Sequence, residues 1–207
     1  PNLYWSSELG VAPTPASSAK SIEILFDAQL TMAQQVSSVC GTCIGLLRML
    51  RKLVPLLSFS TLHTVVSALV LSRLDYGNLL YLCLPNGLLD RLQVVLNDAV
   101  RMTYKLPRST HVSPLLQSLH WLLARQRIQF KTLCLAFKAT NGTGPAFLQK
   151  RLSLYTPSRS LQSANSKLLC VPRFRRSTVG GRSFSVCAPG LWNALPPDLR
   201  LEPQYSR

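Results

Sequence analysis

At the centre of the chain stands the segment Leu119-His120-Trp121-Leu122-Leu123-Ala124-Arg125-Gln126-Arg127-Ile128-Gln129-Phe130-Lys131, which is apolar at its start and basic towards its end. It belongs to a longer stretch, Ala99 to Pro197, that contains fifteen Lys and Arg but no Asp and no Glu. The nearest acids are Asp98 and Asp198. A folded surface with this charge and no acids of its own has to find anions elsewhere, and nucleic-acid phosphate is the commonest source.

Composition supports this expectation. The chain has 207 residues, which predicts one domain or one domain with a tail, and 47% of them are hydrophobic, enough for a substantial core. Its net charge is +15, with six of the Lys and Arg in residues 1–100 and seventeen in 101–207. We therefore expect a contact surface for a polyanion in the second half. An anionic membrane, or a basic surface that serves only solubility, are the alternatives.

Hydrophobic periodicity predicts a mainly α-helical fold, a small bundle of four to five helices with an irregular basic C-terminal extension. The expected helices run over Thr31–Val54, Ser60–Tyr81, from the Asn86-Gly87 turn to about Lys105, Ala124–Thr140 and Pro145–Leu152. The residues expected to line the core side of the first are Val36, Val39, Cys40, Cys43, Leu47, Leu50 and Val54.

Outside these helices the chain divides into segments of different character. We expect a loose N-terminal arm over 1–21, a short strand within 22–30, a helical domain over 31–153 and an irregular basic extension over 154–207, with a possible strand at Leu168–Val171. The run Leu62–Leu84 is apolar enough to suggest a membrane span, but His63, Arg73 and Asp75 within it favour a buried helix instead.

The predicted helix Ala124–Thr140 is the most informative element. Its apolar residues fall on two faces, one with Phe130, Leu133 and Phe137 and the other with Ile128 and Leu135. Between them, within about 40° on the helical wheel, stand three cations that we call the basic ridge: Arg127, Lys131 and Lys138. A row of cations at helical spacing can follow a phosphate backbone, although an ordinary solvated face is the alternative.

A second candidate is Arg173-Phe174-Arg175-Arg176, where cations surround one aromatic ring. This composition suits phosphates with a stacked base, or a plain basic loop. The candidate nucleic-acid-binding residues are therefore Arg125, Arg127, Lys131, Lys138, Arg173, Arg175 and Arg176.

Nothing in the sequence predicts a catalytic or metal centre. Metal-dependent phosphoryl transfer needs clustered carboxylates, but the helical body has only Asp75, Asp90 and Asp98, which we interpret as a turn residue, a cap and a surface acid. We interpret His120, beside Trp121, as a packed or stacking residue. We therefore expect no enzyme activity, no cofactor and no small-molecule substrate.

The cysteines also give no sign of a metal or redox site. Cys40 and Cys43 form a C-x-x-C pair inside a predicted helix with both sulfurs on its apolar face, and no second ligand pair follows, so we interpret them as small core residues. All six cysteines are expected to be reduced and buried in an intracellular protein, nuclear or cytoplasmic. The chain begins with Pro1 and not with Met, so we expect a fragment, a processed product or an incomplete gene model. It shows no charged segment followed by an apolar one at its start, so we expect no signal peptide and a protein that is not secreted.

Six short motifs occur in a fixed order along the chain. They are Ser72-Arg73-Leu74-Asp75-Tyr76-Gly77-Asn78; Leu92-Gln93-Val94 with Asn97 and Arg101; Leu119-His120-Trp121-Leu122; Arg127-Ile128-Gln129-Phe130-Lys131; Tyr155-Thr156-Pro157-Ser158-Arg159-Ser160-Leu161; and Phe184-Ser185-Val186 followed by Ala188-Pro189-Gly190-Leu191-Trp192-Asn193-Ala194-Leu195-Pro196. Together they resemble the C-terminal part of the reverse transcriptase of vertebrate non-LTR (LINE-type) retrotransposons of the chicken-repeat kind. The sequence departs from that family at Gly77, Leu96 and Leu123, where Cys, Gln and Pro are usual.

The resemblance implies a position after the polymerase palm. Residues 22–30 would be the last palm strand, 31–153 a thumb-like helical domain, and 154–207 a post-thumb extension. The family's catalytic carboxylates belong upstream, so none is assigned to this chain. The expected function is non-catalytic binding of RNA or an RNA–DNA hybrid, with the remainder of the reverse transcriptase as a further partner. The alternative is a structural or protein-interaction domain, an inactive relic without nucleic-acid binding.

Overall fold

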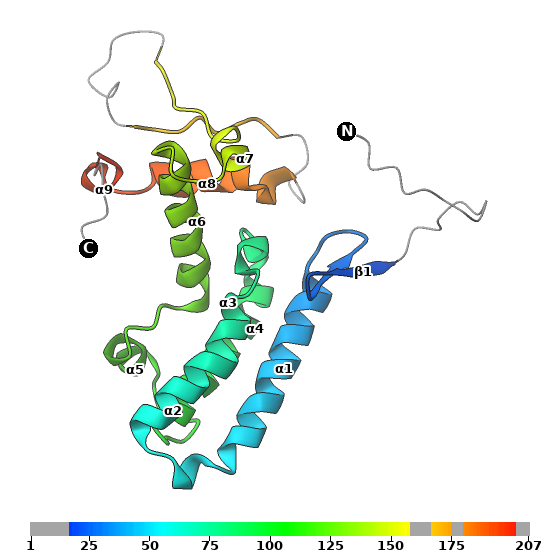
Figure 1. Ribbon diagram of the computed structural model, residues 1–207, viewed down its shortest axis with the longest axis vertical. Coiled ribbons are helices and arrows are strands. Elements are labelled where there is room, and N and C mark those ends of the chain that lie inside the picture. Colours follow the sequence, from blue (N-terminus) through cyan, green and yellow to red (C-terminus); the bar gives the residue numbers. More distant parts are fainter. Residues whose placement is uncertain (1–16, 158–166, 175–179, 202–207) are drawn as a thin grey trace, which may run out of the picture.

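The computed structural model describes residues 17–157, 167–174 and 180–201. In this part of the chain the protein is mainly helical, which confirms the predicted fold class. Figure 1 shows a lower bundle of long helices and an upper layer of shorter ones, with α6 (Ala124–Thr140) running from one to the other.

An antiparallel hairpin precedes the bundle. β1 (Ser18–Ser21) pairs with β2 (Ile24–Asp27), and Ile22 and Glu23 form the turn with φ angles of 46° and 62°. Positive φ at both turn residues matches the twist of paired strands. β2 confirms the strand predicted within 22–30, whereas the loose arm predicted over 1–21 is wrong for Ser18–Ser21, which form β1. A β-branched residue rarely adopts positive φ, so the sequence gives little sign of this turn.

The larger core forms where α1 (Ala33–Arg51) packs along α4 (Asn86–Thr103). The seven residues predicted to line the core side of the first helix are all buried or half-buried, which confirms that face. The apolar side of α4 contributes Leu92, Val95 and Leu96, each of them fully or almost fully buried.

A third helical run lies against this pair. α2 (Phe59–Val66) continues through a π turn (Ser67–Leu71) into α3 (Ser72–Asp75), so the predicted helix ends at Asp75 rather than Tyr81. The chain then turns at Gly77, whose φ is +63°, before the 3₁₀ turn η3 (Asn78–Tyr81). A Cβ at Gly77 would lie 2.7 Å from Ile24 Cδ1, the end of a flexible side chain that can turn aside, so this position favours glycine chiefly for its conformation.

The smaller core lies around the C-terminal half of α6. α8 (Phe184–Asn193) packs on it there, and the buried members of this cluster are Ala136, Leu169, Ala188 and Trp192. The predicted irregular extension is thus wrong for this part, which contains α8 and α9 (Pro197–Leu201). Pro189 lies inside α8 and is buried; it removes one backbone donor, which the packing of α8 on α6 offsets.

The remaining elements are short. α5 (Ser113–Ser118) lies between two of the predicted helices, where no helix was expected, and α7 (Ala146–Gln149) occupies the first half of the predicted helix Pro145–Leu152. The possible strand at 168–171 is reduced to one antiparallel bridge between Leu154 and Leu169.

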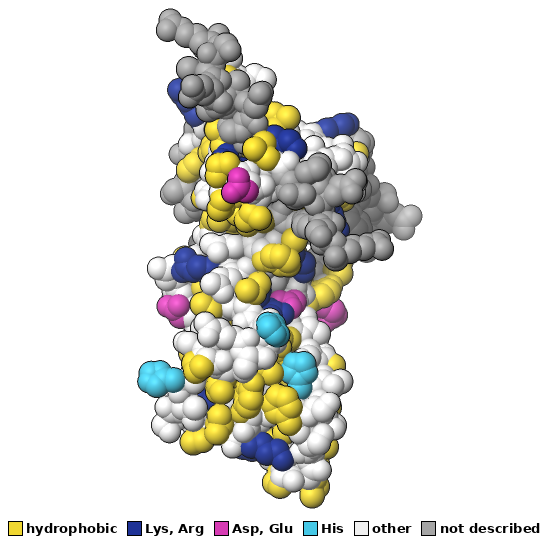
Figure 2. Space-filling model, turned by 90° about the vertical axis from the view of Figure 1, so that its left-hand side faces the viewer, with side chains coloured by type: hydrophobic (Ala, Val, Ile, Leu, Met, Phe, Trp, Pro, Cys, Tyr) yellow, Lys and Arg dark blue, Asp and Glu magenta, His cyan; other side chains and the backbone are white. Residues whose placement is uncertain are grey.

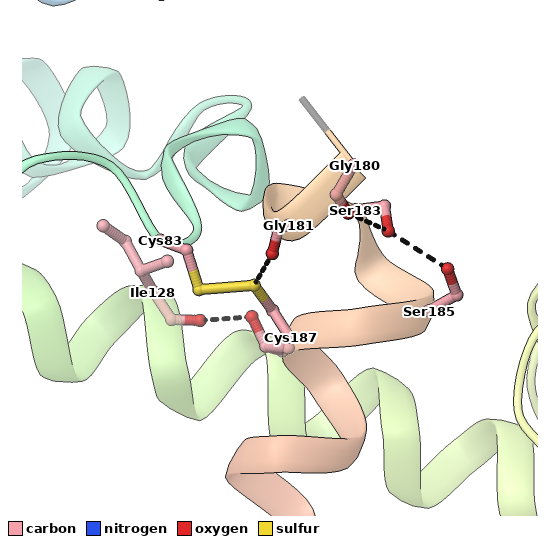
Figure 3. Close-up of a disulfide and its surroundings, with 8 residues drawn as sticks. Cys83, Ile128, Gly180, Gly181, Ser183, Ser185 and Cys187 are labelled. Atoms are coloured by element: carbon pink, nitrogen blue, oxygen red, sulfur yellow. Dashed lines mark hydrogen bonds between the residues drawn. A yellow bond between two sulfur atoms is a disulfide. The ribbon is translucent and has the colours of Figure 1, made fainter. Parts of the chain in front are cut away.

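A disulfide joins the two parts of the fold. Cys83, which follows η3, is bonded to Cys187 on α8, with their Cα atoms 7.0 Å apart (Figure 3). The prediction of six reduced, buried cysteines is therefore wrong for this pair, and also for Cys170, which is exposed. The reason is spatial: 104 residues separate the paired cysteines in sequence, and only the packing of α8 brings them together.

Candidate nucleic-acid interface

The position of α6 is fixed at both ends. The side chain of Gln93 accepts a hydrogen bond from the Ala124 nitrogen at 2.8 Å, and that of Gln126 accepts one from the Leu123 nitrogen at 3.2 Å. These amides satisfy backbone donors that a helix start leaves unpaired. At the other end Gly142, with φ +72°, reverses the chain. The cations of α6 therefore stand on a well-anchored helix.

The faces of α6 differ in part from the prediction. Ile128 is buried as expected, and Leu133 and Phe137 pack against the smaller core. Phe130, however, is 60% exposed, so its assignment to a packed face is wrong. It lies nearer the N-terminus than the part of α6 that α8 covers, and periodicity alone cannot show where a covering element ends.

Two cations of the basic ridge are tied to α3. Arg127 donates to both carboxylate oxygens of Asp75, from Nε at 2.9 Å and from the terminal nitrogen Nη2. Lys131 Nζ donates to the backbone carbonyl of Asp75 at 3.0 Å. Asp75, predicted to be a turn residue, is thus the anchor of the ridge. Its carboxylate neutralises Arg127, whose side chain is 19% exposed, whereas Lys131 is exposed and keeps its charge because its partner is a neutral carbonyl.

The other candidates are more open to solvent. Lys138 is exposed, and among the described residues its side chain has no hydrogen-bond or ion-pair partner. Arg125 is exposed and donates to the Asn86 side chain at 2.6 Å. Arg173 is exposed as well. The predicted cluster of cations around Phe174 cannot be placed further, because Arg175 and Arg176 lie outside the described residues.

The acid-free stretch finds some of its counter-charge within the molecule. Besides the pair of Arg127 with Asp75, Arg101 and Arg108 lie 3.5 Å and 3.7 Å from the carboxylate of Asp98. On the face shown in Figure 2, basic side chains are separated by apolar and neutral ones and do not form one continuous patch. The expectation that the cations have no partners of their own is therefore wrong for these three arginines. The fold brings Asp75, which is distant in the sequence, next to Arg127, and it places Asp98, just outside the stretch, next to Arg101 and Arg108.

The cysteine and histidine predictions have different outcomes. Cys40 and Cys43 are buried core residues, as predicted, and burial raises the pKa of both thiols, that of Cys43 to about 11. His120 is exposed, and the ring that stacks on Trp121 is His63, at 5.6 Å between centroids. The stacking prediction for His120 is therefore wrong, because α2 brings a histidine that is distant in sequence to the tryptophan.

Within the described ranges, no three His, Cys, Asp or Glu side chains come together in a group that could hold a metal ion. The helices in these same ranges include none with the length and apolar composition needed to cross a bilayer. Comparison with known proteins adds no assignment: no protein-family model, curated protein or solved structure matches the chain.

Proposed function

We propose that this chain is a non-catalytic, thumb-like region of a non-LTR retrotransposon reverse transcriptase that holds RNA or an RNA–DNA hybrid by its phosphates. The observation that carries the proposal is the exposed pair Lys131 and Lys138 on α6. Arg125 on the same helix and the net charge of +15 of the whole chain add to the positive potential. The six ordered motifs and the helical bundle that follows a short hairpin are consistent with it.

The three residues of the basic ridge have different roles in this proposal. Lys131 and Lys138 lie two helical turns apart on α6, a spacing at which two cations can contact phosphates along one strand. Arg127 serves a supporting role in this proposal, because its guanidinium is already paired with Asp75 and holds α6 against α3. Phosphate contacts carry no sequence information, so binding is expected to be independent of base sequence.

The test is a salt series on the full chain with a short RNA–DNA hybrid, measured by fluorescence anisotropy from about 50 to 200 mM salt. The double variant Lys131→Gln with Lys138→Gln is expected to make the negative slope of log affinity against log salt shallower by about 2, one for each phosphate contact that is lost. The matched control is Arg48→Gln with Arg91→Gln, which removes two exposed cations from α1 and α4 and leaves α6 intact.

The two variants have the same net charge, so a general field effect would weaken binding equally in both. Equal losses, or an unchanged slope in the α6 variant, would contradict the proposed contact. Binding that does not respond to salt at all would contradict phosphate recognition as such.

A second candidate function is protein interaction without nucleic-acid binding. It is favoured by an apolar groove of about 450 Å³ whose lining includes Phe26, Leu80, Leu135 and Phe147, the last of them 67% exposed. In the proposed context this groove is a surface for the remainder of the polymerase. If interaction is the sole function, Lys131→Glu and Lys138→Glu leave binding of a partner unchanged, whereas Phe147→Asp abolishes it.

A further inference from the structure

A basic hollow lies where the C-terminal ends of α1 and α4 meet, away from the ridge on α6. Its volume is about 170 Å³, and the charged side chains that line it are Arg51, Asp98, Arg101, Lys105 and Arg108. Four positive side chains and one negative one leave a formal charge of +3 around one small cavity.

The carboxylate of Asp98 lies next to two of these arginines. Asp98 Oδ1 lies 3.5 Å from Arg101 Nη1, and its Oδ2 lies 3.7 Å from Arg108 Nη2. Arg101 is fixed further by donating from Nε to the Thr110 carbonyl at 3.1 Å. A guanidinium has five N–H donors, so both groups keep donors for a ligand. Asp98 and the Thr110 carbonyl orient Arg101, whereas Arg108 is 78% exposed and lies near Asp98 without a hydrogen bond to it.

The other two cations are open. Arg51 and Lys105 are exposed, and neither side chain has a hydrogen-bond or ion-pair partner in the part of the chain that the structure describes. Cations in the last turn of a helix are favoured by the helix dipole, which accounts for Arg51 and Arg101 taken singly. It does not account for Arg108, which belongs to neither helix, nor for the meeting of both helix ends at one cavity.

We propose that this hollow binds a phosphate group carrying two negative charges. A terminal phosphate ester or free phosphate is close to dianionic at neutral pH, with a second pKa near 6, whereas a phosphodiester carries one charge only. The formal charge of +3 is therefore better matched by the dianion. The volume is several times the roughly 30 Å³ of a water molecule in the liquid, so a phosphate group fits.

Two sources share this chemistry: the phosphorylated end of a nucleic-acid strand and free phosphate. Occupation by a strand end rests on the proposed function, but binding of free phosphate does not. The proposal for the hollow and the proposal for the ridge on α6 can therefore be contradicted independently of each other.

The first experiment follows thermal unfolding of the full chain in increasing inorganic phosphate, with sodium chloride holding the ionic strength constant at pH 7.5. A ligand that binds only the folded state raises the midpoint, and the rise reports its affinity. We expect a saturating rise for the natural sequence, and an apparent affinity weakened roughly tenfold or more in Arg51→Gln with Lys105→Gln, because two charge-assisted contacts are lost.

The matched control, Arg48→Gln with Arg91→Gln, removes two exposed cations that do not line the hollow and is expected to respond to phosphate as the natural sequence does. At pH 5, where phosphate is mainly monoanionic, the rise is expected to shrink. An equal response in both double variants, or no response beyond that to sodium chloride, overturns the proposal. Both variants change exposed residues, and their circular dichroism and midpoints in chloride alone verify that they fold.

The second experiment separates the two sources. Two oligonucleotides of the same sequence, one with a 5′-phosphate and one with a 5′-hydroxyl, are compared for affinity. A preference for the phosphorylated strand that disappears in Arg51→Gln with Lys105→Gln assigns the hollow to strand ends. Equal affinities, together with a saturating response to inorganic phosphate, assign it to free phosphate.

Discussion

Cys43 shows how burial changes the chemistry of one side chain. It is completely buried in the larger core, and desolvation, reinforced by the neighbouring Cys40, raises the pKa of its thiol from 9.0 to about 11, against a small opposing effect of Arg73. The folded protein therefore keeps the Cys43 proton at a pH where the unfolded chain has already lost it. This difference links the stability of the fold to alkaline pH.

The sign follows from the raised pKa. Below pH 9 both states hold the proton, and Cys43 imposes no pH dependence; as pH rises from 9 to 11 the unfolded state is increasingly favoured. We expect the free energy of unfolding to fall by up to about 3 kcal/mol over this interval, measured by urea unfolding. In Cys43→Ala the fall should be smaller. Some should remain, because burial also raises the pKa of Cys40 and Tyr81. A fall of the same size in the variant would contradict this account.

At the scale of single elements, Gly77 separates α3 from η3. Its φ of +63° is costly for a residue with a side chain, and an added Cβ would also displace the end of the Ile24 side chain. We expect Gly77→Ala to lower the free energy of unfolding by roughly 1–3 kcal/mol in urea titrations.

The control for this prediction is Gly41→Ala. Gly41 is exposed within α1, and an added Cβ there has no atom of a neighbouring element within 4 Å. Alanine is the better helix former, so this variant is expected to gain about 0.5–1 kcal/mol. If both alanine variants changed stability in the same direction, the special role of Gly77 would be refuted.

The elements that the sequence predicts well are those whose burial follows local periodicity. The buried faces of α1 and α4 repeat every three to four residues, so Val36, Cys40 and Leu47 could be placed without knowledge of their neighbours. α8 was missed because Pro189 inside a helix is rare, and only its burial against α6 makes it acceptable.

The candidate site could be predicted less completely. The exposure of Lys131 and Lys138 follows from the pattern of α6, but the pairing of Arg127 with Asp75 does not, because 52 residues separate them. The same limit applies to the basic hollow. Arg51 and Arg101 stand at the ends of two helices, and no local pattern shows that these ends meet.

At the scale of the whole molecule, the Cys83–Cys187 disulfide closes a loop over a sequence separation of 104 residues. A cross-link over such a loop restricts the unfolded chain and typically adds about 2–4 kcal/mol. Cys83→Ser is expected to lower the free energy of unfolding of the oxidised protein by this amount. Cys170→Ser, at an exposed cysteine outside the bond, should leave it unchanged.

Thiol titration tests the pairing directly. The denatured, unreduced protein should expose four thiols, from Cys40, Cys43, Cys134 and Cys170, and six after reduction. Cys83→Ser should expose five without reductant, because Cys187 loses its partner. Six thiols in the unreduced natural sequence would show that the bond is absent.

The position of this bond also decides how the molecule comes apart when its backbone is cut. A single proteolytic cut anywhere between residues 84 and 186 leaves two polypeptides that stay attached through sulfur. On a gel without reductant such a nicked protein would not separate into smaller species, and on a gel with reductant it would appear as two bands. Cys83 is exposed, so a reducing agent can reach the bond and release the pieces.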